Sequence, residues 1–502
     1  MSSMKLTNSV NADVPKNYES PLDMGILPKR KKEKGVNKMK RIDNRDLLSD
    51  FSPERRKSSV RSILSSLRSS TQNFVSITLA SKQISTVEAV NHMFCGLGGI
   101  NLTYLPQMYL QIGIVPCLGI SFFYCLLHPI VVLNIIKKKT VLSNEAEKNL
   151  NTIGAIEYLI EGSYLWLQYW MSCIRRLITI FTVSYHLAIC IYLVNYLTQL
   201  LVLVMGYKNF IAASELTLIM FLVPLTIITN IKNLHGITIT SAIANVSMLV
   251  AVIIFFFKCV TIKPDWQKID YFKNMKDIPI FIYLTVTHVW PTCLFLVIEE
   301  RMYMPEHFGG LRGVFCTSYF LTIISDTVVS IAAAFMFSTF QDEVNPGATL
   351  PDYMLTCAII SSCLFKYPLH FYVCVVSLWQ NHLHARVPAN LRAGWPNLIL
   401  RVFLNSTVVA FVLFLPFTNK IFQIIQIISC CCLGLILPAM LNIVHNLIRD
   451  KRSLIFSLTL NLILIVTGVV TMIISIMGEL SNNKQTFVAN WTTTSEIMKT
   501  PL

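Results

Sequence analysis

Eleven apolar runs of about 20 residues follow one another along this 502-residue chain. A helix of that length crosses the roughly 30 Å hydrocarbon core of a membrane, and it satisfies its backbone polar groups where water is absent. Charged residues make up 14% of the chain, against about 25% in soluble proteins. We therefore predict an all-α, multi-pass membrane protein with eleven transmembrane helices. The expected spans are 90–112, 116–136, 177–201, 214–231, 237–257, 278–298, 314–337, 354–379, 398–418, 421–445 and 454–477.

The distribution of lysine and arginine predicts the orientation. Residues 1–89 hold 17 of the 42 lysines and arginines, so the N-terminus should be cytoplasmic. The loops expected on the opposite side are poor in positive charge, apart from 258–276. Eleven crossings place the short tail 478–502 outside the cell or in a lumen. That tail contains Asn490-Trp491-Thr492, a pattern that accepts N-linked glycans.

Residues 1–85 form a basic tail, and residues 86–477 form the transmembrane transporter domain. The tail is rich in polar and basic residues and poor in apolar ones, which predicts disorder. Basic clusters such as Lys29–Lys32 favour contact with anionic lipid headgroups, although a merely solvated tail that sets topology explains them too. We expect no nucleic-acid binding, because the basic residues have no folded, aromatic-bearing surface.

The first apolar run is interrupted by three glycines in four residues, Gly96, Gly98 and Gly99. Each costs a helix roughly 1 kcal/mol against alanine. Broken helices at mid-membrane present backbone groups and helix dipoles to charged substrates. On this reading, the backbones of Gly98, Gly99 and Ile100 bind a substrate carboxylate, with Gly96 and Asn101 beside them. Equally, the glycines allow a neighbouring helix to pack closely.

Several motifs resemble one family in the same order. The segment from His92 to Pro106 reads HMFCGLGGINLTYLP, and Glu299–Phe308 reads EERMYMPEHF. Tyr367–Val373, with the series from Arg401 to Pro438, continues the likeness. These segments resemble proton-coupled amino acid transporters of the amino acid/auxin permease family. The resemblance implies two inverted repeats of five helices, broken first and sixth helices, and import of small amino acids with protons.

The sixth run departs from the family pattern. Relatives usually carry Phe-Glu-Gly at the unwound point, where this chain has Val289-Trp290-Pro291. Proline still breaks a helix there, but the loss of the carboxylate and the bulk of Trp290 should change the substrate. We place His288 and Trp290 at the substrate site. Glu299 and Glu300 are expected to face water at the cytoplasmic edge or to cap positive loops.

His92 is the candidate for proton coupling. It matches the family's histidine, and an ordinary histidine pKa near 6.5 allows loading on an acidic side. A hydrogen-bonded packing role is the alternative. Lys366 and Asp326 are further coupling candidates, because charges inside a membrane are costly. Lys366 would supply a fixed charge where sodium-coupled relatives bind their ion, or it would form a structural ion pair with Asp326. The other buried candidates are His128, His186 and His370.

Two functions stay open from the sequence. One is a secondary transporter that moves small amino acids with protons. The other is an amino-acid sensor of the same fold that signals through its N-terminal tail. The sequence contains no nucleophile–base set and no metal-ligand spacing, so we expect no enzyme, cofactor or metal. It leaves the plasma membrane and the lysosomal or endosomal membrane as alternative locations.

Overall fold

The computed structural model describes residues 83–98, 105–147, 150–161, 165–205, 210–262, 271–273, 275–340, 350–384, 386–388, 395–414, 419–449 and 454–481. These residues form helices, and the only pairing of strand type among them is an isolated parallel bridge between Ile84 and Met302. Nine helices in this described part are long and apolar enough to cross a membrane. The protein is therefore a multi-pass integral membrane protein. The basic tail and Asn490 lie outside the described residues, and the predictions for them stay predictions.

The helices follow the predicted runs closely. Their bounds are α2 Thr86–Leu97, α3 Leu105–Ile112, α4 Ile114–Glu145, α5 Thr152–Glu161, α6 Leu165–Met205, α7 Phe210–Thr229, α8 Leu234–Ile262, α9 Ile278–Val289, α10 Thr292–Arg301, α11 Val314–Phe340, α12 Leu350–Leu378, α13 Trp395–Phe414, α14 Asn419–Cys431, α15 Leu437–Arg449 and α16 Leu454–Ser481.

Two predicted spans are not among the nine long apolar helices of the described residues. The run 90–112 corresponds to the two short helices α2 and α3, and the run 214–231 corresponds to α7, whose apolar stretch is Thr217–Thr229. The exact number of eleven spans and the inverted repeat therefore stay predictions. Helix α5 was not predicted, because its ten residues are too few to cross a membrane.

The two interrupted helices run antiparallel to each other. Next to the start of α2, Ile84 N–H donates to the Arg301 carbonyl at 2.8 Å, and Tyr303 N–H donates to the Ile84 carbonyl at 2.9 Å. At the other end, Lys273 N–H donates to the Ile112 carbonyl at 2.9 Å. Helix α2 accordingly packs on α10, and α3 packs on α9. Sequence positions far apart thus form one central pair of helices.

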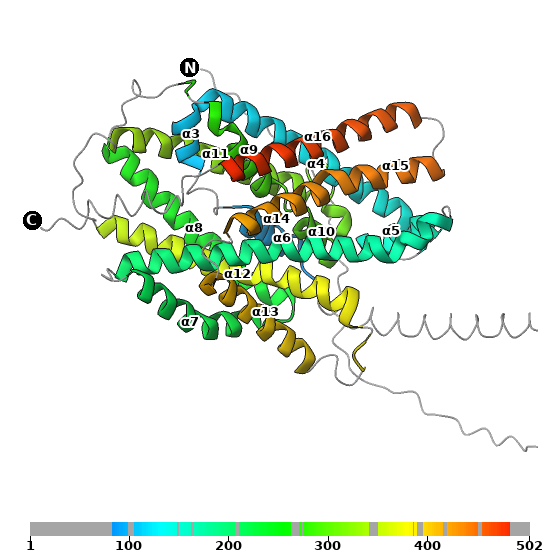
Figure 1. Cartoon of the computed structure of the whole chain (residues 1–502), viewed down its shortest axis with the longest axis horizontal. Coiled ribbons are helices and arrows are strands. Elements are labelled where there is room, and N and C mark those ends of the chain that lie inside the picture. The colour runs from blue at the N-terminus through cyan, green and yellow to red at the C-terminus, as the bar shows by residue number, and fades with distance from the viewer. Residues whose placement is uncertain are drawn as a thin grey trace, which may run out of the picture. The chain divides into compact units, whose positions relative to one another are not determined.

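The remaining helices surround this pair. Helix α2 contacts α8, α11 and α12, whereas α9 contacts α4, α14 and α16. In Figure 1, α9 lies against α16, and α6 runs beside α12. The helix of the predicted run 421–445 is also irregular, with a π-helical turn at Cys432–Ile436 between α14 and α15. Many outward side chains are large and apolar, as on α8, which suits contact with lipid.

Candidate functional site

The first break begins at Gly98, directly after α2. Its backbone is extended, with φ −72° and ψ 145°. Its N–H donates to the Phe94 carbonyl at 2.9 Å, and its own carbonyl accepts a hydrogen bond from Lys366 Nζ of α12. Lys366 is only 2% exposed. The C-terminal end of a helix carries unpaired carbonyls and partial negative charge, so the ammonium group neutralises the end of α2.

This contact corrects one alternative. Lys366 does not form the structural ion pair with Asp326 that we considered from the sequence. Asp326 instead lies on α11 and pairs with His288 of α9, with Oδ2 and Nε2 3.0 Å apart. The lysine thus belongs to the first break, and the aspartate belongs to the second.

Gly96 lies where α2 and α10 approach each other. A Cβ atom at this position would overlap the Leu294 side chain of α10. This glycine therefore permits α2 and α10 to pack closely, which is the packing role that the sequence left open. Gly99, Ile100 and Asn101 lie outside the described residues, so their assignment to a substrate carboxylate stays a prediction.

His92 is fully buried between α2 and α8. Its Nδ1 lies 2.9 Å from Ser241 Oγ, and its Nε2 lies 3.2 Å from Thr238 Oγ1. The Thr238 hydroxyl also donates to Glu88 Oε1 at 3.4 Å. If Thr238 donates to Glu88, it accepts from His92 Nε2–H, which leaves Nδ1 to accept from Ser241. With these donors and acceptors, His92 is the neutral tautomer that carries its proton on Nε2.

A polar chain leads from His92 to the surface. Glu88 Oε1 lies 2.5 Å from Nδ1 of His235, whose side chain is 68% exposed. Glu88 also completes a capping box with Ser85 at the start of α2. We did not predict Ser241 and Thr238 as partners of His92, or His235 as the partner of Glu88. Only the capping box had a local signal, Ser85 followed by glutamate three residues later.

Trp290 fills the second break. Its side chain is 1% exposed, and its ring Nε1–H donates to the Tyr124 carbonyl at 3.4 Å. The ring stacks on His128 at a centroid distance of 5.9 Å and packs edge-on against Tyr124. A Cβ added to Gly434 of the π-helical turn would lie 3.2 Å from Trp290 Cε3. The interruption is therefore occupied by tightly packed aromatic side chains.

The other predicted histidines have different surroundings. His128 lies among aromatic rings of Trp290, Phe295, Phe315 and Tyr319, and neither of its ring nitrogens has a hydrogen-bond partner in the described structure. His186 of α6 and His370 of α12 face each other, with their Nδ1 atoms 3.2 Å apart. None of these three contacts the first break directly through a described hydrogen bond.

A small cavity lies beside the second break, with a volume of about 20 Å³. It is bounded by α3, α4, α9 and α11. The His288–Asp326 pair forms part of its wall, together with the hydroxyl-bearing residues Tyr109, Ser121, Thr285 and Thr327. The structure thus joins two residues that we predicted separately, one for substrate and one for proton coupling.

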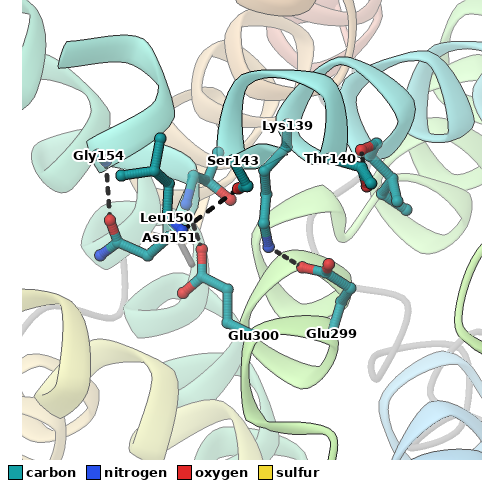
Figure 2. A network of polar contacts seen from close by, with 10 residues as sticks. Lys139, Thr140, Ser143, Leu150, Asn151, Gly154, Glu299 and Glu300 are labelled. Atoms are coloured by element: carbon teal, nitrogen blue, oxygen red, sulfur yellow. Dashed lines mark hydrogen bonds and ion pairs between the residues drawn. The ribbon is translucent and has the colours of Figure 1, made fainter. Parts of the chain in front are cut away.

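A polar network closes the far end of α10. Glu299 is buried and forms an ion pair with Lys139 of α4, and Glu300 Oε1 accepts from Thr152 N–H at 2.6 Å. Figure 2 shows Lys139 pointing at Glu299 and Glu300 pointing at the start of α5. Glu299 does not face water, and its ion pair with Lys139, one of three consecutive lysines, agrees with the alternative that it caps positive charge. The ion pair holds the end of α10 against α4, and the Glu300 contact holds it against α5.

Comparison with solved structures finds transporters of low sequence identity. The chain is similar to structures of a manganese transporter from Eremococcus coleocola. One, in complex with an aromatic bis-isothiourea substituted compound, is 14% identical, with 85% of this chain and 92% of that chain covered and a TM-score of 0.45. A mutant of that transporter, in which alanine replaces a histidine, is likewise 14% identical, with 84% and 92% covered and a TM-score of 0.45.

The sequence model described as transmembrane amino acid transporter protein matches residues 82–481. The match covers most of the chain and includes both interrupted helices. This chain therefore belongs to the transmembrane amino acid transporter protein family.

Proposed function

We propose that this protein is a secondary active transporter that moves small amino acids across a membrane in symport with protons. Family membership supports transport, and the interrupted helix pair supports the substrate class. The observation that carries the proposal is the end of α2 at Gly98, where the backbone turns extended and the Gly98 carbonyl accepts a hydrogen bond from the buried Lys366. Such a break suits the carboxylate and ammonium of an amino acid.

Lys366 supports protons over sodium as the coupling ion. Its ammonium already contacts the Gly98 carbonyl at the end of α2. In the proposed mechanism this tethered cation replaces a bound metal cation, because a second positive charge beside it would be repelled. His92 then serves as the titrating group, with Glu88 and His235 linking it to the surface.

Substrate binding requires movement of the half-helices. The cavity beside the second break is about 20 Å³, close to the size needed for one water, and too small for an amino acid. The Lys139–Glu299 pair and the Glu300–Thr152 hydrogen bond hold one end closed. We propose that release of substrate at that end requires α2 and α10 to separate from α4 and α5.

The direct test is uptake into vesicles of purified protein. Labelled small amino acids are offered at about pH 5.5 and about pH 7.5 outside, on either side of the ordinary histidine pKa. We expect accumulation only with the acidic outside. Accumulation driven by sodium alone at equal pH would contradict the proposal.

A sensor function is the second candidate, and one observation favours it. The segment joining the tail to α2 is hydrogen-bonded at Ile84 to Arg301 and Tyr303, so movement of α10 reaches the tail. Removal of residues 1–80 distinguishes the two. A transporter keeps uptake without the tail, whereas a sensor binds amino acid with little uptake and loses its signal.

Topology is tested separately. We propose a cytoplasmic N-terminus and an Asn490 glycan on the opposite side, in the plasma membrane or a lysosomal or endosomal membrane. Asn490→Gln should remove the glycan and leave transport unchanged. An N-terminal tag that protease reaches in intact cells would contradict this orientation for a plasma-membrane protein.

A further inference from the structure

The His288–Asp326 pair lies beside the second break, outside the cluster of aromatic rings around Trp290. His288 lies in the last turn of α9, two residues before Trp290, and Asp326 lies on α11. Both side chains are buried, and their Nε2 and Oδ2 atoms are 3.0 Å apart. Neither residue contacts Lys366 or His92 through a described hydrogen bond, so the pair is distinct from the Lys366–Gly98 contact and from the polar chain of His92.

The cavity beside this pair has the size and chemistry to hold water. Its volume of about 20 Å³ exceeds the roughly 10–15 Å³ that one water requires. A buried water also needs two to four polar partners, and the lining offers the hydroxyls of Tyr109, Ser121, Thr285 and Thr327. Thr285 is 3% exposed, and its hydroxyl is buried without a partner in the described structure. That unpaired hydroxyl is satisfied if the cavity holds a water.

Charge balance gives the pair a reason to bind a proton. An aspartate beside a neutral histidine leaves one uncompensated negative charge, which is costly inside a membrane protein. None of the described residues that line the cavity is a lysine or an arginine. A proton on the imidazole makes the pair neutral overall and strengthens the contact between α9 and α11.

Other titratable groups surround the pair but do not replace it. Within the lining, α3 contributes the Tyr109 phenol, α4 contributes the Cys125 thiol, and α9 and α11 contribute only the pair itself. The other titratable or charged groups on the helices that pack against α9 or α11 lie outside this lining. These include Glu88, His92 and Cys95 on α2, His128 on α4, His235, Lys258 and Cys259 on α8, Lys420, Cys430 and Cys431 on α14, and Glu479 on α16.

We propose that His288 and Asp326 form a second proton-binding site, reached through one water in this cavity. The inference rests on the proposed proton-coupled transport. A hydronium ion entering the cavity gives its proton to the imidazole and remains as water, and the reverse step releases the proton. Because His92 sits at the first interrupted helix and this pair at the second, each interrupted helix then binds its own proton.

The test counts protons per transported amino acid. Purified full-length protein in vesicles is given labelled glycine, alanine and serine, while a pH-sensitive dye records proton entry. In Asp326→Asn and His288→Gln, we expect the ratio of protons to amino acid to fall to roughly half, because one of two sites is lost. Asp326→Glu keeps a carboxylate and should retain the ratio. Thr285→Val, which removes only one hydroxyl, should retain the ratio and slow uptake.

The outcomes separate this inference from the proposed function. Proton-coupled uptake with an unchanged ratio in both Asp326→Asn and His288→Gln overturns the second site and leaves the proposed function standing. No proton-coupled uptake by the wild-type protein overturns the proposed function itself. If either variant fails to fold, proton uptake on amino acid binding is measured in weakly buffered detergent solution for the wild type and His92→Asn. A proton still bound by His92→Asn supports the second site, and none overturns it.

Discussion

The two interrupted helices of this protein are built in different ways. The first is broken at glycines, and the exposed carbonyl of Gly98 is satisfied by a buried lysine from α12. The second is broken at Pro291 and filled by the ring of Trp290. One break thus depends on charge and backbone, and the other on side-chain packing. Changes at Lys366 should therefore alter binding more than folding, and changes at Trp290 should do the reverse.

The largest effect is expected for Trp290→Ala. Removing a buried aromatic side chain costs about 3–5 kcal/mol in the free energy of unfolding, through lost burial and the cavity left behind. Thermal unfolding of the purified protein measures this loss, and Trp290→Phe should recover most of it. A stable Trp290→Ala protein with altered substrate choice would show that the ring borders the substrate and is not mainly core.

Glu299→Gln tests the closed end of the second interrupted helix. The change leaves the buried Lys139 without its carboxylate, and breaking a buried ion pair costs about 3–5 kcal/mol. Part of that cost is avoided if α10 moves away from α4. We expect faster labelling of a cysteine introduced at Ser143, with Thr140→Cys as a second reporter. Equal labelling rates with and without Glu299→Gln would mean that the Lys139–Glu299 pair does not hold this end closed.

Lys366→Met tests the first break. The variant keeps much of the side-chain length but leaves the Gly98 carbonyl without its charged donor. A hydrogen bond to a charged group contributes about 1.5–3 kcal/mol. We expect most of that loss to fall on the conformation of the break that binds substrate, so amino acid affinity should fall roughly 10- to 100-fold. Thermal stability should fall less than in Trp290→Ala. A larger loss of thermal stability in Lys366→Met than in Trp290→Ala would overturn the comparison between the breaks.

His92→Asn should separate binding from coupling. Asparagine retains hydrogen bonding toward Ser241 and Thr238 but does not titrate. Exchange of internal for external amino acid should continue, while accumulation driven by an acidic outside falls by about tenfold for each pH unit of gradient. Lower expression with unchanged pH dependence would assign His92 a packing role instead.

The smallest effect is expected for Gly434→Ala. The added methyl group would lie 3.2 Å from Trp290 Cε3, so the ring must shift by a few tenths of an ångström. Alanine recovers about 1 kcal/mol of helix propensity, which offsets much of that strain. We expect a change within about 1 kcal/mol in the free energy of unfolding. A large loss would show that Trp290 has no room to move, which would sharpen the contrast with the glycine-built first break.

The sequence alone predicted the helical runs and both interruptions, because these depend on local properties. A membrane requires about 20 apolar residues per crossing, and Pro291 disrupts its own helix wherever that helix packs. Capping by Ser85 and Glu88 is equally local, since the two residues are three positions apart. The short helix α5 was missed because it lacks the length that marks a span.

The partners of the charged groups were decided only by the tertiary structure. Lys366 and Asp326 looked suited to each other in the sequence, yet the fold gives the lysine to Gly98 and the aspartate to His288. The same holds for Lys139 and Glu299, which are 160 positions apart. Any buried charge requires a partner, so composition predicts that pairing occurs. Which groups meet depends on how α2, α9 and α10 pack against their neighbours, and no local pattern encodes that choice.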